Sequence, residues 1–120
     1  MPIAQFEERL AKVRHRFAST LEGKIQDTYG ALPLLSSASE GAFETLEATY
    51  RRIHGICGVG PTVGFPRTGK AAREAEAVLL EAYHSHRGLT EAELNQFRKK
   101  LHELQEAAKS ELQSTFVGLR

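Results

Sequence analysis

The sequence predicts an all-α protein: an antiparallel four-helix bundle in which an N-terminal extension of the first helix could form a lid. In four separate segments, apolar residues recur at three- and four-residue steps, the period of a helix that buries one face. No segment alternates apolar and polar residues as a half-buried strand does. The breaks between segments are short, so consecutive helices are expected to fold back on one another.

The first helix is predicted from about residue 3 to residue 29. The apolar residues on one face of this helix are Ile3, Phe6, Leu10, Val13, Phe17, Leu21 and Ile25. Their spacing predicts one buried stripe. Gly30 and Pro33 end the pattern. This helix is the longest of the four, so its early turns are expected to pack on the outside of the bundle.

The second helix is predicted to start after the serine-rich segment 36–39, whose hydroxyls are expected to cap it. Its stripe consists of Phe43, Leu46, Tyr50, Ile53 and Cys57. The Gly60-Pro61 pair marks its end, and a loop continues to about Pro66.

The third helix is predicted from about Arg67 to Gly88, along Ala71, Ala72, Ala75, Val78, Leu79, Ala82 and Tyr83. Thr90 and Glu93 then form a capping box, a hydroxyl followed three residues later by a carboxylate. This box opens the fourth helix, whose stripe is Leu94, Phe97, Leu101, Leu104, Ala108 and Leu112.

Length and composition favour one domain, residues 1–120, with its function in a local site. The 16 basic and 15 acidic residues nearly cancel, which argues against partnership with nucleic acid or an anionic membrane. The single cysteine excludes an internal disulfide and a CxxC motif, and it favours a cytoplasmic location. The acidic N-terminal segment is unlike a signal peptide, and no apolar run approaches the ~20 residues of a membrane span. We expect a monomer, since the four stripes can cover one another.

His54 is the first candidate functional residue. On a helix it lies about 100° from Ile53, at the rim of the core face. Gly58, one turn later, has no side chain, and Gly55 lowers the surface further, so a large partner could reach the imidazole. The alternative is an ordinary surface histidine favoured by the negative end of the helix dipole.

Glu76 is the second candidate, because it is a carboxylate on an apolar stripe with Ala72, Leu79 and Tyr83. Such a group needs a partner. If the second and third helices form a hairpin, Glu76 comes level with His54 and can bind its Nδ1. That bond would fix the tautomer and leave Nε2 as a nucleophile. The alternative is a rim carboxylate paired with Arg73 or Lys70.

These residues resemble the pattern of histidine-containing phosphotransfer (Hpt) domains. The likeness spans residues 50–80. It consists of His54 with an aliphatic residue two positions later (Ile56), glycines four and ten later (Gly58, Gly64), an apolar residue after the second glycine (Phe65), and a small-residue helix that carries Glu76.

The resemblance implies a role for each of these positions. His54 would accept the phosphoryl group, and Glu76 would orient its ring. Gly58 would give clearance to a receiver domain, and Gly64 would form the turn of the hairpin. Many Hpt domains carry a lysine three residues after the histidine, where this chain has Cys57; Arg51, Lys70 or Arg73 could supply the charge instead. The predicted docking residues are Arg51, Gly55, Cys57, Gly58, Lys70 and Arg73.

As an Hpt-like protein, the chain would be a phosphocarrier and not an enzyme with its own nucleotide site. Its partners would be response-regulator receiver domains and a hybrid or sensor histidine kinase. It would need no cofactor, because Mg²⁺ is expected only on the receiver. Two alternatives stay open: a helical interaction module that binds a receiver without carrying phosphate, and the phospho-accepting domain of a chemotaxis-type kinase.

Other candidate sites are weaker. His84 and His86 are two positions apart and share no helix face, so no metal site is predicted. His15 and His102 lie among charged residues, and we expect them to be solvated. Gly58-Val59-Gly60 lacks the preceding strand and the Gly-Lys-Ser/Thr ending of a phosphate loop.

Overall fold

The structure is a computed structural model that describes residues 2–118, with side chains from residue 3 to residue 114. Its elements are α1 (Pro2–Ala31), the 3₁₀ turn η1 (Leu32–Leu34), α2 (Ala42–Val59), the 3₁₀ turn η2 (Gly60–Val63), α3 (Pro66–His84) and α4 (Glu91–Gly118). Within residues 2–118 there is no strand, only an isolated bridge between Ser36 and Leu89. The prediction of an all-α protein is confirmed. Residues 1, 119 and 120, at the limits of the predicted 1–120 domain, lie outside the described residues.

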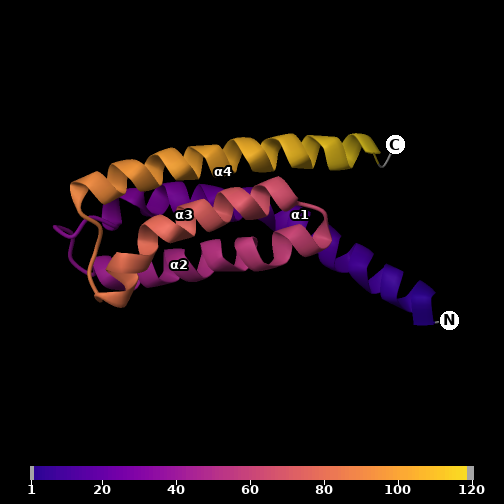
Figure 1. The fold of residues 1–120 in the computed structure, drawn as a ribbon, viewed down its shortest axis with the longest axis horizontal. Helices are drawn as coiled ribbons and strands as arrows, with labels where there is room; N and C mark the ends of the chain where they lie inside the picture. The colour runs from indigo at the N-terminus through magenta and orange to yellow at the C-terminus, as the bar shows by residue number, and fades with distance from the viewer. Residues whose placement is uncertain (1, 119–120) are drawn as a thin grey trace.

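The four helices lie along one elongated body of 54 × 26 × 18 Å. In Figure 1 the chain runs along α1, returns along α2, and repeats this with α3 and α4. One hydrophobic core joins the helices, and each of them contributes a fully buried leucine: Leu21, Leu46, Leu79 and Leu101. No helix among the described residues combines the length and the apolar character needed to cross a membrane.

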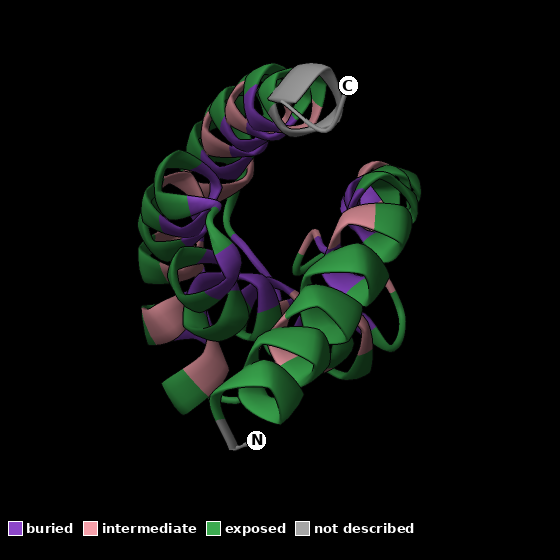
Figure 2. Ribbon diagram, turned by 90° about the vertical axis from the view of Figure 1, so that its right-hand side faces the viewer, coloured by how far each residue is buried: buried purple, intermediate pink, exposed green. Residues whose placement is uncertain are grey.

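The first half of α1 departs from the predicted buried stripe. Phe17, Leu21 and Ile25 are buried, but Ile3, Phe6 and Val13 are 71%, 65% and 48% exposed. The physical reason is that α1 extends past the far end of α2 (Figure 1), so its first half is only loosely covered, and Phe6 and Val13 line an open hollow with Val59. The first turns of α1 are coloured as exposed in Figure 2. The prediction that the whole stripe is buried is therefore wrong. A lid function of this extension stays a prediction.

The sequence predicted a side-chain cap at the start of both α2 and α4, and the structure shows one only at α4. The predicted serine cap of α2 is wrong: the helix begins after Gly41, at φ +71°, and has no side-chain cap. The serines bind loop backbone instead, since Ser39 Oγ donates to the Pro33 carbonyl at 3.1 Å. The capping box of α4 is confirmed. Thr90 N–H donates to Glu93 Oε1 at 2.9 Å, and Glu93 N–H donates to Thr90 Oγ1 at 3.2 Å.

The connection between α2 and α3 is tight because two of its glycines are used for conformation and for packing. Gly64 has φ +94°, a left-handed conformation that glycine adopts without steric cost. Gly69, in the first turn of α3, lies against η2, where an added Cβ would come within 2.6 Å of the Pro61 ring. This turn fixes the height at which residues of α2 and α3 face each other.

Candidate functional site

The site lies where α2 and α3 run side by side. His54 is on α2 and its side chain is 64% exposed, whereas Glu76 is on α3 and its side chain is only 13% exposed. The hairpin brings His54 Nδ1 within 3.0 Å of Glu76 Oε1. This is the pair that the sequence predicted from the carboxylate on an apolar stripe, and the structure brings the two residues together.

The contact selects one chemical form of the ring. An ionised carboxylate only accepts hydrogen bonds, so it favours the proton on Nδ1. In the neutral ring Nε2 then carries the lone pair. The same carboxylate stabilises positive charge on the imidazole when Nε2 is substituted. A histidine held in this way can react as a nucleophile through Nε2.

Two glycines leave open space on the surface beside His54. Gly55 and Gly58 are both exposed, and a Cβ added at either position would meet nothing within 4 Å. Gly60 differs, because its added Cβ would lie 3.2 Å from the Phe65 carbonyl oxygen. The glycines that follow His54 therefore divide into two groups: Gly55 and Gly58 leave the imidazole accessible, and Gly60 and Gly64 shape the hairpin.

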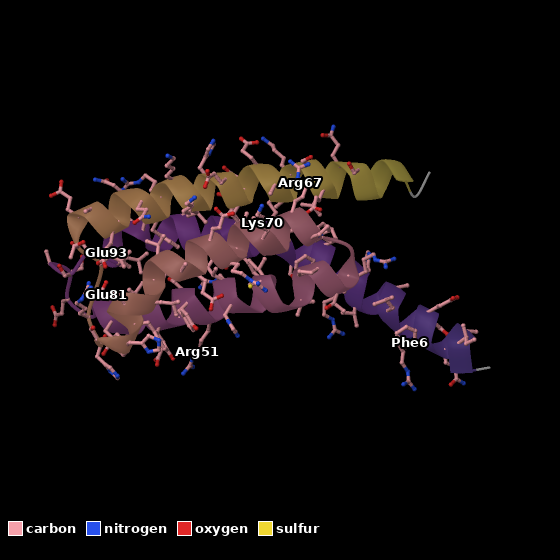
Figure 3. All side chains as sticks on the ribbon, in the orientation of Figure 1. Phe6, Arg51, Arg67, Lys70, Glu81 and Glu93 are labelled. Carbon is pink, nitrogen blue, oxygen red and sulfur yellow. The ribbon has the colours of Figure 1, made fainter. Side chains whose placement is uncertain are left out.

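The basic residues near the site differ in their surroundings. The Arg73 guanidinium lies beside the Cys57 thiol, which raises the pKa of Arg73 above its ordinary value, and the Glu76 carboxylate adds to this shift. Arg51 is bound to Glu47 at 3.5 Å and lies on the outer edge of α2, whereas Lys70 lies on α3 (Figure 3). Lys70 and Arg73 also line a small hollow of about 220 Å³ beside Pro61 and Pro66. Arg73 thus lies next to Cys57 and within the electrostatic influence of Glu76, the residue that binds His54.

Cys57 lies one helical turn after His54 on α2. It is a free thiol and is 8% exposed, so it lies beneath the face that carries His54 and belongs to the core. Arg51, Gly55, Gly58, Lys70 and Arg73 are exposed. Of the predicted docking residues, these five can therefore contact a partner directly in this conformation.

Two aromatic residues of the site were not singled out from the sequence. The Tyr50 ring lies 5.7 Å from the His54 ring at an interplanar angle of 11°, and Tyr83 stacks on Tyr50 at 4.2 Å and 18°. The signal was present in the spacing, since residues four apart on a helix are neighbours. The sequence predicts both tyrosines on apolar stripes, and Tyr50 one turn from His54, but it indicates no stacking between them.

Among the remaining histidines, His102 Nε2 lies 3.7 Å from Glu106 Oε1, but both of these side chains are exposed on α4. His86, at φ +53°, stacks on Phe43 at 4.7 Å, and His15, His84 and His102 are exposed. Across the described part of the chain, no three His, Cys, Asp or Glu side chains are grouped so as to hold a metal ion. Comparisons of the chain with protein-family models, curated proteins and solved structures found no match. The contact between His54 and Glu76 is therefore the main functional feature that the described residues offer.

Proposed function

We propose that the protein is a phosphorelay intermediate. His54 accepts a phosphoryl group from the aspartate of a receiver domain and passes it to the aspartate of another receiver. The observation that carries this proposal is the exposed imidazole whose Nδ1 is held 3.0 Å from Glu76 Oε1. The Hpt resemblance of residues 50–80 supports the same function.

In the proposed step, the Nε2 lone pair attacks the phosphorus of the aspartyl phosphate. The P–Nε2 bond forms as the bond between phosphorus and the carboxylate oxygen breaks, and the aspartate leaves as a carboxylate. The ring becomes positive and keeps its Nδ1 proton, which Glu76 accepts in a hydrogen bond. The second transfer is the same reaction in reverse, onto a different aspartate. Phosphoryl transfer depends mainly on positioning and charge stabilisation, and the receiver, with its Mg²⁺, would supply most of the latter.

This chain would therefore contribute the nucleophile and a docking face, without a nucleotide site of its own. Arg51, Lys70 and Arg73 give that face a positive character that suits an acidic receiver surface. The phosphoryl group would originate from a hybrid or sensor histidine kinase. We place the protein in the cytoplasm as a monomer, in keeping with its free buried cysteine and the single core shared by its helices.

A second candidate function is a helical interaction module that binds a partner without carrying phosphate. The observation that favours it is a hollow of about 490 Å³ between the first half of α1 and the end of α2. Phe6, Val13 and Val59 line it, and each of them is at least 40% exposed. A partner could use this surface whether or not His54 reacts.

The test is intact-mass spectrometry after incubation with phosphorylated receiver domains from the same organism, at neutral to mildly alkaline pH. We expect one phosphoryl group on the protein, lost in acid and absent from His54→Gln. His102→Gln, which changes an exposed histidine of α4, is the matched control and should accept the group normally. If no receiver donates to a folded protein that still binds one, the interaction module is the better description.

A further inference from the structure

The His54 imidazole is bounded on one ring face as well as at Nδ1. Tyr50 and His54 have centroids 5.7 Å apart and planes within 11°, and Tyr83 continues the stack at 4.2 Å from Tyr50. On the opposite side along α2, Gly58 leaves open space. The imidazole thus has the Tyr50 ring on the side toward the start of α2 and open space on the side toward the end of α2.

Helices α2 and α3 provide both the hydrogen bond to His54 Nδ1 and the aromatic stack beside the ring. Tyr50 is one turn before His54 on α2, and Tyr83 is seven residues, or two turns, after Glu76 on α3. The helix spacing that sets the hydrogen bond to Nδ1 therefore also sets the stack. Both tyrosines are half-buried and pack against the hydrophobic core, which limits the movement of their rings.

A hydrogen bond and a stack restrict different motions. The Glu76 contact determines which edge of the imidazole faces α3 and favours the Nδ1–H tautomer. A single bond still leaves the ring plane free to tilt, and a tilted ring makes a longer, less linear hydrogen bond that favours this tautomer less. A parallel ring beside the imidazole limits this swing, because offset-stacked aromatic pairs have a preferred geometry. Neither contact alone fixes the direction of Nε2; together they do.

We propose that Tyr50, backed by Tyr83, is a positioning residue that sets the plane of the His54 ring and so keeps Nε2 aimed into the open side next to Gly58. This inference rests on the proposed function for its consequence, a faster phosphoryl transfer. Its structural content, a fixed ring plane and tautomer, can be measured without any phosphoryl donor.

The chemistry of Tyr50 suits this role. Burial raises the pKa of Tyr50 above its ordinary value, and the nearby Glu76 carboxylate raises it further. Tyr50 is therefore an uncharged phenol at neutral pH. A neutral aromatic face also attracts a cation, so it favours the positive imidazole that exists while the phosphoryl group is attached.

The first experiment is ¹⁵N NMR of the His54 ring in the full chain, with Tyr50→Leu, Tyr50→Phe and Tyr29→Leu. We expect a dominant Nδ1–H tautomer in the wild type, a mixture of tautomers in Tyr50→Leu, and recovery of the wild-type signal in Tyr50→Phe. Tyr29→Leu is the matched control, since it removes a half-buried tyrosine that binds Gln105 at 3.1 Å on the other side of the bundle. An unchanged tautomer in Tyr50→Leu would overturn the inference.

The second experiment measures phosphorylation of His54 by phosphoramidate, a small donor that loses ammonia as the P–Nε2 bond forms. We expect Tyr50→Leu to be roughly ten-fold slower than the wild type, because small misplacements of a reacting group cost up to about 10²-fold. Tyr50→Phe should restore the rate to within about two-fold. If Tyr50→Phe is as slow as Tyr50→Leu, the hydroxyl acts and the stack does not, which also overturns the inference.

The two experiments separate the inference from the proposed function. If receiver domains do not phosphorylate His54 but Tyr50→Leu still alters the tautomer, the relay fails and the positioning role stands. If receivers phosphorylate His54 and Tyr50→Leu changes neither the tautomer nor the rate, the relay stands and the positioning role fails.

Discussion

Glu111 of α4 binds Thr68 in the first turn of α3. Its Oε1 accepts hydrogen bonds from the Thr68 backbone N–H at 2.6 Å and from the Thr68 hydroxyl at 2.7 Å, while Oε2 accepts from Arg67 N–H at 3.2 Å. The residue before α3, Phe65, provides no side-chain cap, so a carboxylate from a distant helix satisfies these free N–H groups. A negative charge is also favourable at a helix N-terminus. Because α3 carries Glu76, this contact helps to place the functional site.

The first prediction concerns Glu111→Ala. The substitution leaves buried donors of Thr68 without a partner, and it should lower the free energy of unfolding by about 1–3 kcal/mol. Urea unfolding of the two proteins measures the difference. Glu106→Ala removes an exposed carboxylate of α4, five residues before Glu111, whose only ion pair is a surface contact of 3.7 Å with His102 among the described residues, and it should stay within about 0.5 kcal/mol of the wild type. Equal effects at the two positions would mean that the cap contributes nothing specific.

The Glu111 contact also marks where sequence reasoning ends. Glu76 could be predicted because its position on a stripe implied a partner, and the short hairpin limited the choice to residues of α2. Glu111 binds Thr68 and Arg67, which precede it in the sequence by 43 and 44 positions. No local sequence pattern relates the start of one helix to the end of another. Contacts of this kind depend on the tertiary packing of α3 against α4.

Dependence on tertiary packing also explains why the exposure of the first half of α1 could not be predicted from its sequence. Its apolar period correctly predicts a helix, since the period is a property of the segment itself. Whether the stripe is buried depends on what lies opposite, and α2 ends at Val59. Ile3 and Phe6 therefore stay exposed even though they follow the same helical period as Leu21 and Ile25. The capping box of α4 needs only four consecutive residues, so it could be predicted in full.

The second prediction concerns Glu93 and pH. Glu93 binds Arg87 through two hydrogen bonds of 2.8 and 3.1 Å, and this contact, with that of Thr90, lowers the pKa of Glu93 to about 2. A carboxylate with a depressed pKa stabilises the folded state above its unfolded pKa, and this contribution is lost as the pH falls toward the folded value. Glu93 should thus contribute up to about 3 kcal/mol at pH 7, decreasing from about pH 5 to about pH 2.

The measurement is urea unfolding of the wild type and Glu93→Gln at several pH values. We expect the difference between the two proteins to be largest near neutrality and to shrink as the acid protonates Glu93. Glu91→Gln, an exposed acid in the same helical turn, should give a small difference at every pH. A Glu93→Gln difference that is constant down to pH 2 would contradict the ionic origin of the contribution.

The third prediction separates the two effects of Glu76 on His54. Glu76→Ala removes both the hydrogen bond to Nδ1 and the negative charge, and it should slow phosphorylation by phosphoramidate roughly ten- to a hundred-fold. Glu76→Gln keeps an acceptor oxygen for Nδ1–H and loses only the charge, so it should be less affected. Glu74→Ala, which removes an exposed carboxylate bound to Lys100 at 3.1 Å, is the control on the same helix. Equal rates for the wild type and Glu76→Ala would remove Glu76 from the site.

The last prediction uses the open space at Gly58. Nothing lies within 4 Å of a Cβ added there, so Gly58→Leu should fold normally and gain up to about 1 kcal/mol from the better helix propensity of leucine. The new side chain would lie one turn from His54, where a receiver domain has to approach. Misfit of this kind costs about 1–3 kcal/mol, which corresponds to a transfer rate roughly five- to a hundred-fold lower.

Two comparisons make this prediction specific to access. Phosphoramidate is small, and its reaction with Gly58→Leu should stay within about two-fold of the wild type, because the orientation of the ring is unchanged. Gly69→Ala provides the opposite control: its Cβ would come within 2.6 Å of the Pro61 ring, so it should destabilise the fold by about 1–3 kcal/mol. If Gly58→Leu slows the receiver and phosphoramidate equally, the side chain disturbs His54 itself, and Gly58 does not act by leaving room for a partner.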